Sequence, residues 1–426
     1  MKFEGSYSLE RAGAPPEKGA VVLSLLEDSL VLAPARGTPL TLPWESLLSF
    51  SPADHKVLLA ISGASLVISG LGYKYDDLVR RASRLRNERL IKLGLAGEPM
   101  KHSMIEADLS FSAPGREFAG RCELRIHETS LLALPETAEY LRLPFRYIAE
   151  VKEEDYAVEI KAVTGEIWRL SGLGGKYDHF RGSLAAAMGE NALFVQGALA
   201  AAMPGADPLK VRALSGLLKE GLLVASEAIE KAAPGAFALI EKRICSSKTD
   251  AAEYGFLKGL AAPGRLAFGV KKGLMGALSG DHFILVFGVE KPAPAAVVEY
   301  FLVEPAGEKT DKAATYVYRL PPAVVWEDFL SFFNRAMTAV NFRRMPVLLS
   351  DEALLAPKNA VYAGALARVT ELRELRSLYA GRAVHSEDGG WEADVKAILG
   401  FAASSRGQAR WRKGGAAGPE EEEGEE

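Results

Sequence analysis

The sequence predicts an α+β protein: two tandem antiparallel β-barrels, each capped by a C-terminal helix, followed by a helical segment and an antiparallel α+β domain. Three observations predict this class. A ten-residue phrase occurs twice, its upstream flanks repeat at nearly the same spacing, and aromatic-rich strand patterns return in the last third of the chain. The 426 residues are also too many for one hydrophobic core, so several domains are expected.

The repeated phrase is SGLGYKYDDL from Ser69 and SGLGGKYDHF from Ser171, with seven of ten positions identical. Upstream, EDSLVLAP matches ETSLLALP, and LPW matches LPF. These upstream matches have an offset of 101 residues and the phrase has one of 102, so a single inserted residue separates them. A match over three separate segments predicts two copies of one domain, at 1–101 and 102–204.

Each copy contains short β-rich segments, separated by tight turns, and then one helical pattern. The segments AVVLSLL and SLVLAP stand at hairpin spacing in the first copy. Apolar residues then recur at i, i+4 and i+7 in both copies, as Leu78, Ala82 and Leu85 and as Phe180, Leu184 and Ala187. This spacing predicts one amphipathic helix at the end of each copy.

The glycines of the repeated phrase are interpreted as a structural turn. Gly72 and Gly174 lie where a strand ends and a helix begins, which predicts a positive φ at both. Asp76 and Asp178 follow at positions suited to helix N-caps. A phosphate-binding loop would need GxxxxGK[ST] or GxGxxG within a βαβ unit, and the phrase has neither spacing.

With these strand pairs, the LPW or LPF that follows them and the single C-terminal helix, residues 1–204 resemble the pleckstrin-homology superfold in its GRAM-like or bacterial variety. The resemblance implies a bent antiparallel sheet that forms a small barrel plugged by the helix. Lipid-binding members hold inositol phosphates with clustered Lys and Arg in the loop between the first two strands. Here that loop, ERAGAPPEKGA, sets Arg11 and Lys18 beside Glu10 and Glu17, which disfavours phosphoinositide binding. The C-terminal half resembles no family.

The second half of the chain is predicted to begin with a connecting region and to end in a tail. Residues 205–280 show helical patterns and then GFLKGLAAPGRLAFGVKKGLMGALSG, which is interpreted as a small-residue linker, or alternatively as an interfacial membrane element. Residues 406–426 carry a basic aromatic run and then six glutamates, which predicts a disordered acidic tail.

Residues 281–405 are predicted to form the C-terminal α+β domain. HFILVFGVE, VVEYFLVE and ATYVYRLP have strand composition. A following helix carries an apolar stripe that predicts packing on the sheet: Trp326, Leu330, Phe333, Met337 and Val340. Further helices are expected over 366–379 and from Trp391.

No catalytic, cofactor-binding or metal-binding residue can be nominated from the sequence. Its six histidines show no ligand spacing, and its two cysteines have no CxxC spacing and no disulfide framework. The N-terminus lacks a signal-peptide pattern, so a cytoplasmic location is expected. The formal net charge of -4 disfavours nucleic acid as a partner.

Three hypotheses for function follow. The first is a non-enzymatic adaptor that binds a protein partner through the tandem barrels. The second is peripheral membrane attachment through the basic helix, with Arg80, Arg81 and Arg84 as candidate surface-binding residues. The third is an enzyme with an unrecognised site in the C-terminal α+β domain, which a cleft with converging polar groups would favour.

Overall fold

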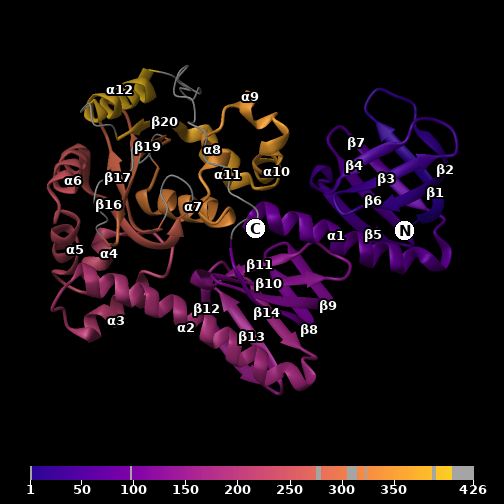
Figure 1. Ribbon diagram of the computed structural model, residues 1–426, viewed down its shortest axis with the longest axis horizontal. Coiled ribbons are helices and arrows are strands. Elements are labelled where there is room, and N and C mark those ends of the chain that lie inside the picture. The colour runs from indigo at the N-terminus through magenta and orange to yellow at the C-terminus, as the bar shows by residue number, and fades with distance from the viewer. Residues whose placement is uncertain are drawn as a thin grey trace. The chain divides into compact units, whose positions relative to one another are not determined.

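The computed structural model describes residues 2–95, 98–274, 280–304, 314–321, 324–385 and 390–404. The chain forms two compact units, residues 1–188 and 189–426. The first holds two curled seven-stranded antiparallel sheets, each followed by a helix, and the second holds a helical region and a further antiparallel sheet (Figure 1). The predicted fold class is confirmed.

The two sheets of the first unit have the same strand order. The first sheet contains β1 (Lys2–Arg11), β2 (Glu17–Leu25), β3 (Ser29–Pro34), β4 (Leu40–Pro43), β5 (Ser49–Ala53), β6 (Lys56–Ile61) and β7 (Ala64–Ser69) and precedes α1 (Tyr75–Leu95). The second contains β8 (Met100–Ala113), β9 (Arg116–His127), β10 (Ser130–Pro135), β11 (Leu141–Pro144), β12 (Ile148–Glu154), β13 (Ala157–Ala162) and β14 (Ile167–Ser171) and precedes α2 (Tyr177–Ala202). The orders β4-β3-β2-β1-β7-β6-β5 and β11-β10-β9-β8-β14-β13-β12 establish the repeat.

Each sheet curls around a core of its own. Alternate residues of the strands point inward, and the matched Trp44 and Phe145 are both buried where LPW and LPF lead into a short 3₁₀ turn. The helix that follows each sheet adds Leu78 to the first core and Phe180 to the second. The helical stripes predicted for the two copies therefore serve the two cores.

The repeated phrase forms the turn from the last strand into the helix. Gly72 has φ +54° and Gly174 has φ +53°, as predicted. The N-cap prediction is wrong: α1 and α2 begin one residue before Asp76 and Asp178, directly after 3₁₀ turns. Both carboxylates thus lie in the first helical turn, where they stabilise the positive end of the helix dipole.

We expect Gly174→Ala to lower the free energy of unfolding by about 1 kcal/mol, because only glycine adopts its left-handed backbone without strain. Gly175→Ala is the matched control. Gly175 has an ordinary φ, and a Cβ there meets no described atom within 4 Å. Denaturant unfolding of the two variants should differ by about 1 kcal/mol, and equal stabilities would contradict the prediction.

The second unit is built on one six-stranded antiparallel sheet. Its strands, in the order in which they pair, are β15 (Val224–Ala225), β16 (Ala261–Leu274), β17 (Gly280–Val289), β18 (Ala295–Leu302), β19 (Ala314–Arg319) and β20 (Tyr379–Val384). Its helices are α3 (Pro208–Leu217), α4 (Ser226–Ala232), α5 (Ala236–Ile244), α6 (Lys248–Leu260), α7 (Trp326–Ala339), α8 (Met345–Leu348), α9 (Asp351–Leu354), α10 (Ala360–Arg368), α11 (Thr370–Leu378) and α12 (Trp391–Ser404).

Helices cover both faces of this sheet (Figure 1). Alternate residues of β17 enter opposite cores, with Leu285 and Phe287 on the side of α3–α6 and α12, and Ile284 and Val286 on the side of α7, α10 and α11. The predicted apolar stripe of α7 is buried along its length in the second of these cores. The sheet is therefore the middle layer of three.

The linker interpretation of the glycine-rich segment is wrong. Residues 261–274 form β16, which pairs with β15 and β17, so the predicted boundary at residue 280 divides one sheet. Gly269 explains part of the glycine content. A Cβ at this position would stand 2.7 Å from the Leu222 carbonyl oxygen, so glycine permits the close approach of two backbones.

Two other boundaries differ from the prediction. The helix expected over 366–379 is two helices, α10 and α11, and Tyr379 already belongs to the edge strand β20. The limit between the first two domains, at 101/102, falls just inside β8, which begins at Met100. The predicted acidic tail, 406–426, lies outside the described residues.

Helix α2 runs from the first unit into the second. Together with the 3₁₀ turn before it, it covers Gly174–Ala202 and is long and apolar enough, by length and composition alone, to span a membrane. Several buried residues of this helix pack in protein cores. Leu184 belongs to the core of the second sheet, and Val195 and Leu199 belong to the core of the second unit. Packing accounts for these three positions, and 28% of the apolar window of the helix is buried.

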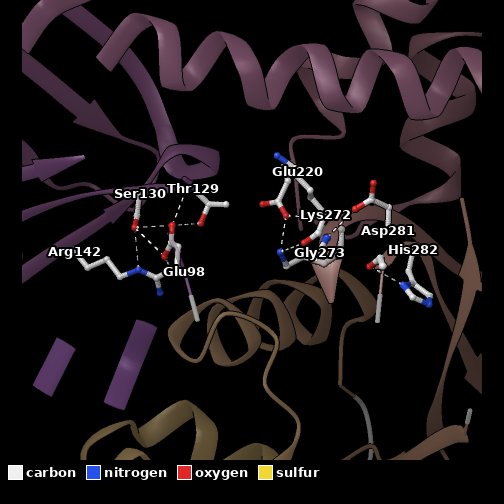
Figure 2. A network of polar contacts seen from close by, with 11 residues as sticks. Glu98, Thr129, Ser130, Arg142, Glu220, Lys272, Gly273, Asp281 and His282 are labelled. Carbon is white, nitrogen blue, oxygen red and sulfur yellow. Dashed lines mark hydrogen bonds and ion pairs between the residues drawn. The ribbon is translucent and has the colours of Figure 1, made fainter. Parts of the chain in front are cut away.

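A buried ion pair joins β16 to the chain segment before β15. Lys271 Nζ lies 2.8 Å from Glu220 Oε1, and both side chains are less than 5% exposed. The backbone N–H of Lys272 donates a further hydrogen bond to the same carboxylate oxygen (Figure 2). Glu220 thus receives several donors in a site from which water is excluded, as a buried carboxylate requires.

Candidate functional site

Helix α1 contacts both sheets of the first unit, through different residues. Arg89 binds Glu45 of the first sheet with two hydrogen bonds. The apolar side chain of Ile91 packs on Leu132 and Leu134 of β10 in the second sheet. One helix therefore belongs to the packing of both copies.

Asn87 makes the most specific contact between α1 and the second sheet. It is 1% exposed. Its Nδ2 donates to the Ala138 carbonyl at 3.0 Å, and its Oδ1 accepts from the Tyr140 N–H at 2.9 Å. The amide thereby makes two hydrogen bonds with the backbone just before β11, which fixes the distance and rotation of the helix.

Two ion pairs flank Asn87. Arg86, with a side chain only 3% exposed, donates to Glu139 at 2.9 Å. Glu88 accepts two hydrogen bonds from Arg125 of β9, which also binds Glu123. The hydrogen bond with Glu88 raises the pKa of Arg125 above its usual value, although burial acts to lower it. The charges are therefore paired where α1 meets the second copy.

A second buried cluster lies where the chain passes from α1 to β8. The carboxylate of Glu98 accepts hydrogen bonds from the Thr129 N–H at 2.6 Å and the Thr129 hydroxyl at 2.7 Å, and Ser130 donates as well. Figure 2 shows these groups and Arg142 converging on Glu98, with Arg142 Nη2 at 3.2 Å. Burial lowers the pKa of Arg142 despite the charge of Glu98. Glu98 thus ties the connection to the second sheet by polar contacts.

A cleft of about 470 Å³ lies between α1 and the outer face of the second sheet. Its lining is rich in charge of both signs: Asp77, Arg80, Arg81, Arg84, Asn87, Glu106, Arg121, Cys122, Glu123, Leu134, Pro135 and Glu136. The three arginines predicted from the sequence as surface-binding residues all line it. By contrast Arg86 and Arg89, which belong to the same basic run, are held in the ion pairs described above.

Some of the charges in the cleft neutralise one another. Arg81 pairs with Asp77 at 2.7 Å, and Arg121 pairs with Glu106 at 3.3 Å. Burial would raise the pKa of Glu123, but the hydrogen bond and charge of Arg125 lower it below its usual value, with a smaller effect of Arg84. Glu123 therefore stays ionised at neutral pH.

Cys122 lines the cleft, but its side chain is 3% exposed and belongs to the core of the second sheet. Burial raises the pKa of its thiol to about 12, with smaller effects of Asp108 and Glu123. The thiol is therefore protonated at neutral pH, and the thiolate is the reactive form. Among the described residues, no group of three or more His, Cys, Asp or Glu side chains could hold a metal ion.

The second unit contains a buried polar cluster that sequence reasoning missed. His385 Nδ1 lies 2.9 Å from Glu253, and Nε2 lies 3.2 Å from Glu299. The Thr315 hydroxyl donates to Glu299 and accepts from the Trp391 indole at 2.7 Å. Each of these side chains is less than 10% exposed, so the cluster holds α6, α12 and the strands together rather than facing a substrate.

The residues predicted from the sequence thus have two roles. Gly72, Gly174, Asp76 and Asp178 shape the repeated turn, whereas the three arginines line the cleft. Asn87, Glu98 and the second wall of the cleft were missed, because the sequence carries no local signal for contacts more than 30 residues apart.

Comparisons with known proteins add little. No protein-family model matches the chain, and no curated protein does. The chain is similar to a solved structure titled as the C-terminal domain of an unknown protein from Leishmania infantum, with 15% identity and a TM-score of 0.20, over 24% of this chain and 94% of that one. It is also similar to the Spt16D Pob3N heterodimer, with 13% identity and a TM-score of 0.14, over 38% of this chain and 83% of that one. At these scores neither similarity assigns a function.

Proposed function

We propose that this protein is a non-enzymatic cytoplasmic adaptor, which binds a protein partner through two pleckstrin-homology-like barrels that α1 joins into one body. The strand order and the C-terminal helix of each copy support the kinship with that superfold. The observation that carries the proposal is the contact of Asn87 with the backbone at residues 138 and 140, beside which the charged cleft lies.

A fixed pair of barrels suits the binding of a protein partner. An interface that is already ordered loses less conformational entropy when the partner binds. The loop that binds inositol phosphates in lipid-binding relatives of this superfold offers Arg11 and Lys18 here, and Arg11 pairs with Glu17 at 3.2 Å. The polar cluster around His385 is buried, so it supports no enzymatic alternative.

The test compares full-length wild type with Asn87→Ala and with Arg36→Ala as the control, in quantitative affinity capture from the source cell. Asn87→Ala leaves a buried carbonyl and N–H without partners, at a cost of about 1–3 kcal/mol each. We expect it to reduce the captured partner about tenfold or more, since fewer molecules hold the competent arrangement. Arg36 is exposed on the first barrel, and its replacement should change nothing.

Liposome flotation tests the alternative of peripheral membrane binding. The proposal expects no binding to vesicles with or without anionic lipid. Salt-sensitive flotation that disappears when Arg80, Arg81 and Arg84 are all replaced by Ala would replace the proposal with peripheral membrane binding. Capture that is equal for wild type and Asn87→Ala would also overturn it. Circular dichroism of each variant separates these results from loss of folding.

A further inference from the structure

Arg80 and Arg84 are two exposed cations of helix α1 that line the cleft, and the charge of Arg84 contributes to lowering the pKa of Glu123. They stand four residues apart, so they share one face of the helix, and both line the cleft. Neither forms a hydrogen bond or ion pair with any residue in the described ranges, and both are exposed. Arg81, between them, is already paired with Asp77.

The opposite wall of the cleft excludes a polyanion. It carries three carboxylates, Glu106, Glu123 and Glu136; Glu106 pairs with Arg121, and Glu123 pairs with Arg125, which also binds Glu88. A nucleic-acid backbone or a phosphorylated inositol would bring several negative charges close to these carboxylates. A peptide segment whose carboxylates are few and separated can place them against the α1 wall and keep them away from the carboxylates of the opposite wall.

An exposed methionine whose N–H bonds to the cleft residue Glu123 has a strained backbone. Met104 has φ +58° at a register shift in β8 and is 72% exposed. It precedes Glu106 of the cleft by two positions on the outer face of the strand. Its N–H donates to the Glu123 carboxylate, and its carbonyl accepts from Lys176, so the bulge is held from both sides. Bulges and strained residues of this kind concentrate at functional sites.

We propose that the cleft binds an acidic, extended peptide segment of the partner protein, with carboxylates on Arg80 and Arg84 and an apolar side chain on Met104. Arginine presents paired N–H donors that match a carboxylate, and a thioether adapts to varied apolar surfaces. The inference rests on the proposed adaptor function and names the chemistry that the adaptor recognises.

The experiment uses the full chain and a fluorescein-labelled ten-residue peptide of Leu and Ser that contains two Glu residues, titrated by fluorescence anisotropy. The comparison peptide has Gln in place of Glu. The variants are Arg80→Ala/Arg84→Ala and Met104→Ser, and the matched control is Arg36→Ala/Arg169→Ala, which removes two exposed arginines outside the cleft.

We expect the Glu peptide to bind wild type at least tenfold more tightly than the Gln peptide does. Arg80→Ala/Arg84→Ala should remove this preference, Met104→Ser should weaken both peptides severalfold, and the control should match wild type. The preference should shrink as salt is raised. No preference in wild type, or a preference unchanged in the cleft variants, overturns the inference.

Competition distinguishes the other ligand classes. Displacement of the Glu peptide by vesicles containing anionic lipid, at lower concentration than by unlabelled peptide, assigns the cleft to a membrane surface and overturns the inference. A result that contradicts acidic-peptide binding in the cleft can be distinguished from one that contradicts the adaptor function. If Asn87→Ala still abolishes capture of a cell protein while the peptide shows no dependence on Arg80 and Arg84, the adaptor stands and the cleft chemistry is wrong.

Discussion

Glu98→Ala is expected to destabilise the first unit by about 3–5 kcal/mol, because it removes a buried carboxylate that accepts hydrogen bonds from Thr129 and Ser130 and forms an ion pair with Arg142. The side chains of Glu98 and Arg142 are 1% and 9% exposed, so water cannot replace the lost carboxylate. Thr129 and Ser130 lose their acceptor in the same substitution. The effect should exceed that of any exposed charge in the unit.

This effect is measured by unfolding the full chain in guanidinium chloride and monitoring the hydrogen exchange of amides within residues 2–188. Glu106→Ala is the matched control, since Glu106 pairs with Arg121 in an exposed position and should cost less than about 1 kcal/mol. Replacing both members of the buried pair, as Glu98→Leu/Arg142→Leu, should recover much of the loss. Equal costs for Glu98→Ala and Glu106→Ala would show that the cluster does not hold the connection.

The second unit is expected to lose about 3 kcal/mol of stability as the pH rises from 6.5 to beyond 9, through the deprotonation of His385. Burial alone would lower its pKa, but the charges and hydrogen bonds of Glu299 and Glu253 raise it to about 9. A raised folded-state pKa favours the proton-bound form. The stabilising contribution of His385 is therefore fully present below its unfolded-state pKa near 6.5. It is lost as the pH rises past its folded-state pKa of about 9.

The measurement compares the pH dependence of unfolding in wild type and His385→Gln. The Gln variant cannot titrate at this position, so the difference between the two slopes isolates the histidine from lysines and tyrosines that titrate nearby in pH. His55→Gln, in a turn of the first sheet, serves as the control. Parallel pH curves for wild type and His385→Gln would contradict the assigned pKa and the ion-pair geometry.

The fold was predictable where one pattern repeats, and poorly predictable where a contact joins distant residues. Duplicated strand patterns marked both sheets, and the stripe from Trp326 to Val340 marked a core helix, since burial imposes a period on the sequence. In β16, glycines such as Gly269 interrupt that period where two backbones approach closely, so the sequence pattern indicates a linker rather than a strand. Strand β20 follows a helical pattern directly and offers only six residues.

The site was predictable only in part, for the same reason. The basic run of α1 identified Arg80, Arg81 and Arg84 but did not separate them from Arg86 and Arg89, because helical spacing shows which residues share a face and not which face meets a neighbour. Glu139 and Glu45, which neutralise the latter two, are 53 and 44 residues away. The cleft exists only after the second sheet packs on the helix.

The central claim is that a protein partner occupies the cleft beside α1. Site-specific photo-cross-linking in the source cell tests this claim most directly. The photoreactive residue p-benzoylphenylalanine would replace Glu136, which lines the cleft, or Arg36 as the reference position. The account predicts a discrete ultraviolet-dependent protein adduct from position 136 that disappears with Arg80→Ala/Arg84→Ala and is absent from position 36. The same adduct from both positions, or one from position 136 that persists without the two arginines, would contradict it.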